Sequence, residues 1–174
     1  MKKALLLLTA SLASILIITL LSSQFSYVGS GKCKICHKTE KQGKQYILWQ
    51  ETKHSTSFTA LTTEKVIQAA QEKEMESMPA ENPKCLRCHA PLFEKTAEIK
   101  EEGVTCEVCH GPGSTYKKLS IMKNREEAIQ NGLTAYASPE EVKAFCLDCH
   151  ENAHQKPFDF EAAWERIKHP RPEK

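Results

Sequence analysis

Residues 106–110 read Cys-Glu-Val-Cys-His, and this Cys-x-x-Cys-His pattern occurs four times in the 174-residue chain. The motifs account for all eight cysteines, as the pairs Cys33/Cys36, Cys85/Cys88, Cys106/Cys109 and Cys146/Cys149. The histidines that follow them directly are His37, His89, His110 and His150. In covalent attachment of haem, two thiols hold the macrocycle and the next histidine ligates the iron. The sequence therefore predicts four covalently bound haem c groups.

Three other uses of paired cysteines compete with this interpretation: a disulfide framework, redox-active pairs, and a zinc ribbon built from the second and third pairs. None of these requires a histidine after each pair. With seven histidines in 174 residues, four such placements by chance have a probability on the order of a few in a million. We therefore expect every cysteine to tether haem, with no disulfide and no free thiol.

The apolar residues are unevenly distributed. They make up 40% of the chain, but many lie within residues 1–21, so the remainder has little apolar material for a core. We expect a mainly α fold, in which helices and long loops wrap around four haems. Capping and periodicity signals predict helices within residues 45–61, 63–78, 124–132, 138–150 and 159–169.

The N-terminus has the form of an export signal. Lys2 and Lys3 precede the uncharged run 4–21, which is typical of a signal peptide and is also near the minimum length of a membrane anchor. We expect residues 1–26 to be a signal peptide or an N-terminal membrane anchor and residues 27–174 to form one tetrahaem domain. The domain should lie in the periplasm, either free or anchored to the inner membrane. The formal charge of +2, without a basic tract, does not suggest nucleic-acid binding.

The histidines are too few to ligate every iron twice. Four of the seven act as proximal ligands, so His54, His154 and His169 remain for four second axial positions. At least one iron therefore lacks a second histidine. His54 and His169 lie in amphipathic segments and are strong candidates, whereas His154 and Met122 are further candidates. Methionine ligation would raise the potential of its haem relative to ligation by two histidines.

Several stretches resemble the tetrahaem cytochrome c-554 family across residues 27–170. They are Tyr27–Ser30, Trp49-x-x-Thr52-x-His54, the segment Gly103–Gly113 with its Gly-Pro-Gly turn, Phe158–Phe160 and Ile167–His169. The resemblance implies that His54 serves the third haem and His169 the fourth. It also implies that the second haem, with proximal His89, is five-coordinate.

The first haem departs from the family pattern. The family has a histidine shortly after the Gly-Pro-Gly turn that serves the first haem, whereas residues 114–118 hold none here. Met122, the nearest donor in position, is our first candidate for this ligand, and His154 is the second.

We expect periplasmic electron transfer between redox partners, such as a quinol-linked dehydrogenase or another oxidoreductase, through closely packed haems. An alternative is an enzyme that reduces nitric oxide, nitrite or hydroxylamine at a five-coordinate iron, and a third possibility is a component of a surface haem assembly. Two propionates per haem would make the loaded protein acidic, which favours a basic patch on its partner. The oligomeric state stays open.

Overall fold

The computed structural model describes residues 25–151 and 153–170, and all regular secondary structure in these residues is helical. The prediction of a mainly α fold is therefore confirmed. The predicted signal or anchor falls almost entirely in residues 1–24, outside the described part. Within the described part, no helix is long and apolar enough to span a membrane.

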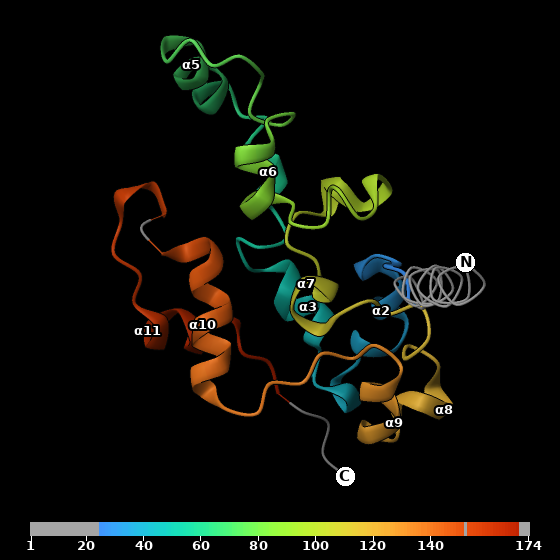
Figure 1. Cartoon of the computed structure of the whole chain (residues 1–174). Helices are drawn as coiled ribbons and strands as arrows, with labels where there is room; N and C mark the ends of the chain where they lie inside the picture. The colour runs from blue at the N-terminus through green and yellow to red at the C-terminus, as the bar shows by residue number, and fades with distance from the viewer. Residues whose placement is uncertain (1–24, 152, 171–174) are drawn as a thin grey trace, which may run out of the picture.

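The elements are short and follow one another along the chain (Figure 1). They are α2 (Ser30–His37), η1 (Glu40–Gln42), α3 (Gln45–Gln50), α4 (Ser57–Ala60), α5 (Glu64–Glu72), α6 (Pro83–His89), η2 (Ala97–Glu102), α7 (Cys106–His110), α8 (Leu119–Met122), α9 (Arg125–Gln130), α10 (Pro139–His150), η3 (Ala153–Gln155) and α11 (Phe160–Ile167).

The predicted capping signals are confirmed at the C-terminal helices. Ser138 Oγ accepts a hydrogen bond from the Glu141 backbone N–H at 3.4 Å, and Glu141 Oε2 accepts one from the Ala137 N–H at 2.7 Å. Asp159 Oδ1 likewise accepts from the Ala162 N–H at 3.0 Å at the start of α11. These bonds satisfy backbone donors that a helix start leaves without partners, which is why the sequence placed these starts correctly.

The prediction of one helix over residues 45–61 is wrong. The structure has α3 and α4 instead, separated by turns over residues 51–56. The hydroxyl of Thr52 donates to the Trp49 carbonyl at 2.8 Å, and that of Ser57 donates to the His54 carbonyl at 2.8 Å. Such local hydroxyl bonds compete with the helical pattern. His54 consequently lies in a turn between two helices.

The apolar core is small, as the composition predicts. Its central cluster consists of Phe58, Leu61, Leu86 and Ala90, which join α4 to α6. The closest packing between elements occurs for α2 with α3 and α7, for α4 with α6 and η2, and for α8 with α9. Helices α5, α10 and α11 are not among these pairs, so protein contacts alone account poorly for their positions.

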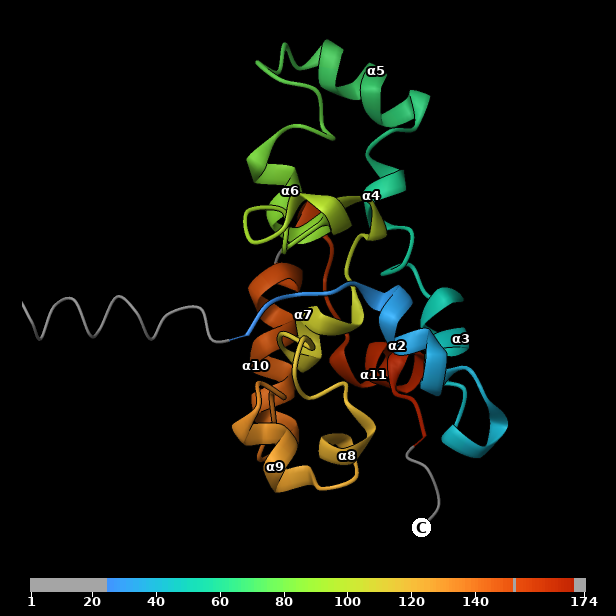
Figure 2. The ribbon, with the colours of Figure 1, turned by 90° about the vertical axis from the view of Figure 1, so that its right-hand side faces the viewer.

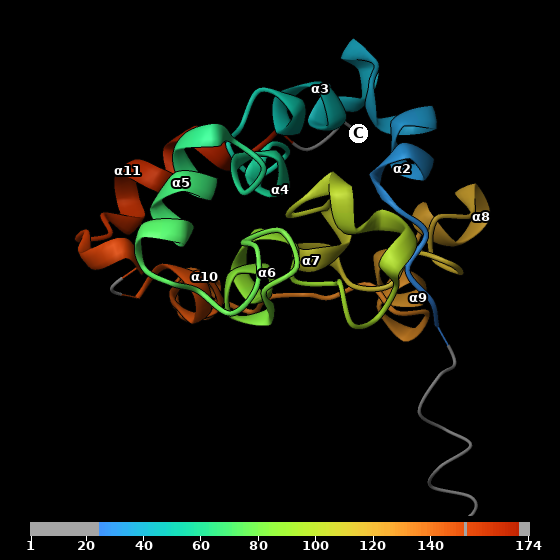
Figure 3. The ribbon, with the colours of Figure 1, turned by 90° about the horizontal axis from the view of Figure 1, so that it is seen from above.

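The spatial arrangement places α7 near the middle of the molecule. Figures 1 and 2 show α5 at one end and α8 and α9 at the other, with α6 between α5 and α7. Seen from above, α10 and α11 lie on the opposite side of the molecule from α8 (Figure 3). The helix with the third motif is therefore surrounded by the elements that carry the other three.

Candidate haem sites

Each Cys-x-x-Cys-His motif lies on a helix that ends at its histidine: α2, α6, α7 and α10. Residues three and four apart share one helix face, so each helix presents two thiols and one imidazole together. None of the eight cysteines forms a disulfide. Every motif thus offers the donor set that haem attachment needs.

Three pairs of histidine rings face each other across gaps of similar size. The ring centroids are 6.1 Å apart for His54 and His150, 6.0 Å for His89 and His154, and 5.8 Å for His110 and His169. A metal–imidazole bond is about 2 Å long, so two imidazoles on opposite sides of one ion have centroids about 6 Å apart. Each pair therefore has the spacing of two axial ligands on one iron.

These pairs differ from those that the family resemblance implies. His54 lies against His150 of the fourth motif rather than His110 of the third, and His169 lies against His110. His154 lies against His89, the site expected to be five-coordinate. The difference arises because the distal histidines reach their partners through the packing of distant segments.

The first motif is arranged differently. The other six histidines form the three pairs, and all seven lie in the described residues. His37 Nδ1 instead lies 3.2 Å from Gln45 Oε1. Met122 is half-buried at the end of α8, which packs against α9.

Desolvation keeps most paired histidines neutral. Burial, with smaller contributions from His169 and His37, lowers the pKa of His110 to about 4. Burial also lowers the pKa of His54, His150 and His169 from the ordinary histidine value. A neutral imidazole has a free lone pair, which is the form that ligates a metal.

A backbone carbonyl orients the proximal histidine of the second motif. His89 Nδ1 donates to the Ser57 carbonyl at 2.8 Å, so its Nε2 is free to ligate. The Ser57 hydroxyl lies 2.8 Å from both the His89 and His54 carbonyl oxygens, and it accepts from the Val104 N–H at 3.0 Å. Ser57 therefore links the second site to the segment that carries His54.

Thiols from different motifs lie close together. A hydrogen bond with the Cys106 thiol raises the pKa of Cys33. Burial and the neighbouring Cys146 raise the pKa of Cys109 to about 11. These contacts join the first motif to the third, and the third to the fourth.

The second motif adjoins the fourth in the same manner. Burial and the neighbouring Cys88 thiol raise the pKa of Cys149 to about 12. The four attachment sites thus follow one another in space in the order first, third, fourth, second, which differs from their order in the sequence.

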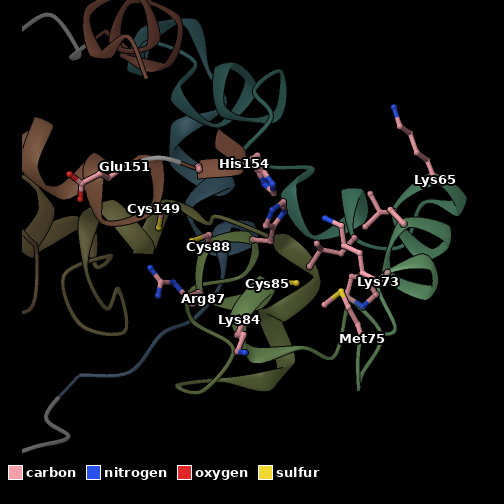
Figure 4. A pocket seen from close by; sticks show the side chains of 17 residues that line it. Lys65, Lys73, Met75, Lys84, Cys85, Arg87, Cys88, Cys149, Glu151 and His154 are labelled. Atoms are coloured by element: carbon pink, nitrogen blue, oxygen red, sulfur yellow. The ribbon is translucent and has the colours of Figure 1, made fainter. Parts of the chain in front are cut away.

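A cavity of about 550 Å³ adjoins the second motif, and Cys85, Cys88 and His89 line it from α6. Figure 4 shows His154 extending into it, on a different side from Lys65, Lys73 and Met75. The volume lies within the range of cofactor pockets. Thiols, a proximal imidazole and a distal imidazole therefore meet around one space.

Helix α5 lines this cavity with a regular face. Val66, Ala69, Ala70 and Lys73 contribute to the lining, at the spacing of one side of a helix. Lys84 and Arg87 add further positive charge to Lys65 and Lys73. An apolar wall with several cations suits an apolar macrocycle that carries two carboxylates.

The third site provides a second test of fit. Thr105 Oγ1, next to Cys106, is buried and has no hydrogen-bond partner among the described residues. Within residues 25–151 and 153–170, no group of three or more His, Cys, Asp or Glu residues is arranged to hold a metal ion. The zinc-ribbon alternative therefore has no support in the described structure, whereas the donors fit haem.

Two carboxylates that the sequence did not single out hold the N-terminal segment against α7. Glu107 is 1% exposed and accepts hydrogen bonds from the backbone N–H groups of Val28, Gly29 and Gly113, the last two at 2.7 and 2.6 Å. Glu102 accepts from the Ser30 N–H at 2.7 Å. These bonds position α2, and with it the first motif, beside the third.

Comparison with known proteins agrees with this geometry. Residues 32–111 match the sequence model of the family described as cytochrome c554 and c-prime. Cytochrome c-554 of Nitrosomonas europaea is 23% identical over 153 residues, which cover 79% of this chain and 63% of that protein. This chain thus spans less than two thirds of that relative. No solved structure matched the chain.

The matched region contains the first three motifs, and the longer alignment with the relative covers most of the chain. Four Cys-x-x-Cys-His helices, the helical fold and these similarities agree with one another. The chain belongs to the cytochrome c554 and c-prime family, whose cofactor is c-type haem.

Proposed function

We propose that this protein is a tetrahaem electron-transfer cytochrome of the periplasm. The observation that carries the proposal is the sequence of neighbouring attachment sites, from the first through the third and fourth to the second. Haem iron, when bound, accepts and donates single electrons. The protein's contribution is to hold the attachment sites at close spacing and in a defined order.

The histidine pairs support specific ligand assignments. We assign His54 and His150 to the fourth site, His89 and His154 to the second, and His110 and His169 to the third. Ligation by two imidazoles gives these sites similar chemistry. Differences between them then come from burial and hydrogen bonding.

The site without a second histidine is the first one in this proposal. Its proximal residue, His37, is the histidine outside the three ring pairs. Met122 remains the first candidate for its sixth ligand. Reduction of nitric oxide, nitrite or hydroxylamine, the alternative activity, would require this position to be open to a small molecule.

The surface around the first motif supports a docking site for a redox partner. Ile35, between the first two cysteines, is 72% exposed, and Cys36 is exposed as well. The exposed lysines Lys32, Lys34, Lys38 and Lys41 lie in the same stretch. We call Ile35 and these four lysines the first-motif surface. Positive charge around an exposed apolar residue favours a partner with an acidic face, which differs from the basic partner expected from the sequence.

The direct test is haem content and redox behaviour of the exported protein. We expect four haems per chain by pyridine haemochrome assay and mass spectrometry, and a reversible redox titration of all four. Electron paramagnetic resonance of the oxidised protein should show three irons with two histidines and one iron that differs. A colourless protein, or one that holds zinc instead, would refute the proposal.

A further inference from the structure

Gln45, the first residue of α3, has a buried side chain that is 9% exposed. Its Oε1 lies 3.2 Å from His37 Nδ1. Its Nε2 donates to the Pro170 carbonyl at 2.9 Å and also to the Gln42 carbonyl. A single amide thus touches the proximal histidine of the first motif and the residue directly after His169.

These contacts determine the orientation of the amide. The two carbonyl oxygens around Nε2 can only accept hydrogen bonds, so both must face the amide's N–H groups. The opposite orientation would place Oε1 against two other oxygens. Gln45 Oε1 therefore faces His37, and because it can only accept, the proton of the His37 ring lies on Nδ1.

The tautomer of His37 matters for ligation. With the proton on Nδ1, the lone pair of Nε2 is free, which is the form a proximal ligand requires. A hydrogen bond from the other ring nitrogen also increases the basicity of a ligating histidine. Gln45 is thereby placed to orient the ring and to strengthen it as an electron donor.

The backbone around Gln45 is shaped to keep these contacts. Gly43 has a positive φ of 86°, and a Cβ there would lie 3.0 Å from both Gln45 Nε2 and the Pro170 carbonyl oxygen. A larger residue at position 43 would thus be strained and would crowd the bond between Gln45 and Pro170. The turn before α3 leaves the space that the amide needs.

We propose that Gln45 is a positioning residue that lowers the reduction potential of the first site and joins this site to the chain segment of His169 at the third. The inference rests on the proposed function, because it takes His37 as a proximal haem ligand. Stronger donation by His37 favours the oxidised iron, so loss of the hydrogen bond should raise the potential.

Two substitutions in the holoprotein separate this role from a merely structural one. Gln45→Leu removes the acceptor and should raise one of the four reduction potentials. Gln45→Glu keeps an acceptor and makes it anionic, so the same potential should fall. Both variants lose the donated bond to Pro170, so a purely structural effect would move both in the same direction.

The measurement is a spectroelectrochemical titration that resolves four components, with Gln50→Leu on the exposed part of α3 as the matched control. Gln45→Met replaces the leucine variant if that variant yields no holoprotein. Opposite shifts of one component support the inference, whereas unchanged potentials or shifts in one direction overturn it. Failure of the proposed function is distinguishable, because the unmodified protein would then lack four titrating haems.

Discussion

The imidazoles of His54 and His150 lie 6.1 Å apart, centroid to centroid, with an angle of 53° between their planes. His54 comes from the turn between α3 and α4, and His150 ends α10. His150 also stacks on Phe158 at 4.5 Å, which restrains the ring from the other side. The fourth motif therefore takes its second histidine from the N-terminal half of the chain.

Replacement of His54 should change the fourth site alone. We expect His54→Ala to retain four haems, because the cysteine tethers remain, and to convert one low-spin iron to high spin. His150→Met followed by His54→Ala should still alter one iron signal in the resonance spectrum. Two altered signals in this double variant would show instead that His54 serves a different motif.

Replacement of His154 should open the second site. The His154 ring lies 6.0 Å from that of His89, on backbone with a positive φ of 53°. We expect His154→Ala to increase carbon monoxide binding to the reduced protein by one molecule per chain. Lys156→Ala, an exposed change in the same loop, is the control, and equal carbon monoxide binding in both variants would contradict the assignment.

Loss of the Glu107 carboxylate should destabilise the holoprotein. Its oxygens accept from three backbone N–H groups, and the side chain is 1% exposed. A buried donor left without a partner costs about 1–3 kcal/mol. We therefore expect Glu107→Ala to lower the free energy of unfolding by roughly 3 kcal/mol or more, measured by thermal or denaturant unfolding. Exposed Glu101→Ala should have little effect.

Alkaline pH should weaken the fold through two tyrosines. Burial raises the pKa of Tyr136 to about 12, and it also raises the pKa of Tyr116 above its ordinary value of 10.0. Above pH 10 the unfolded chain releases phenolic protons that the folded chain retains, so stability falls as the pH rises towards 12. We expect Tyr136→Phe to reduce this slope in unfolding measurements between about pH 9 and pH 12, with Tyr27→Phe as a comparison.

Charge reversal on the first-motif surface should slow electron exchange with anionic reagents. We expect Lys32→Glu, Lys38→Glu and Lys41→Glu together to lower the rate of oxidation by hexacyanoferrate(III) by about tenfold at low salt. The same reversal at Lys117, Lys118 and Lys123 near α8 is the matched control. Equal effects of the two triple variants would indicate a response to net charge and would remove the first-motif surface as an entry point.

The motifs and helix starts were predictable because their signals are local. Three residues of each attachment motif share a helix face through sequence spacing alone, and the caps at Ser138 and Asp159 act within one turn. The break between α3 and α4 was missed because the apolar spacing of residues 45–61 outweighed the hydroxyls of Thr52 and Ser57. Gln45 and Ser57 were missed as well, since no spacing pattern marks an amide or a hydroxyl as a partner of a distant histidine.

The sequence by itself determined the type of cofactor, the eight tethering cysteines, the four proximal histidines and the shortage of histidines for the second axial positions. These conclusions depend on covalent chemistry and counting, neither of which requires a fold. The tertiary structure decided which histidines face each other and in what order the sites lie in space. Those relationships join residues far apart in the chain, so they depend on the packing of the intervening helices and on buried contacts such as those of Glu107 and Gln45.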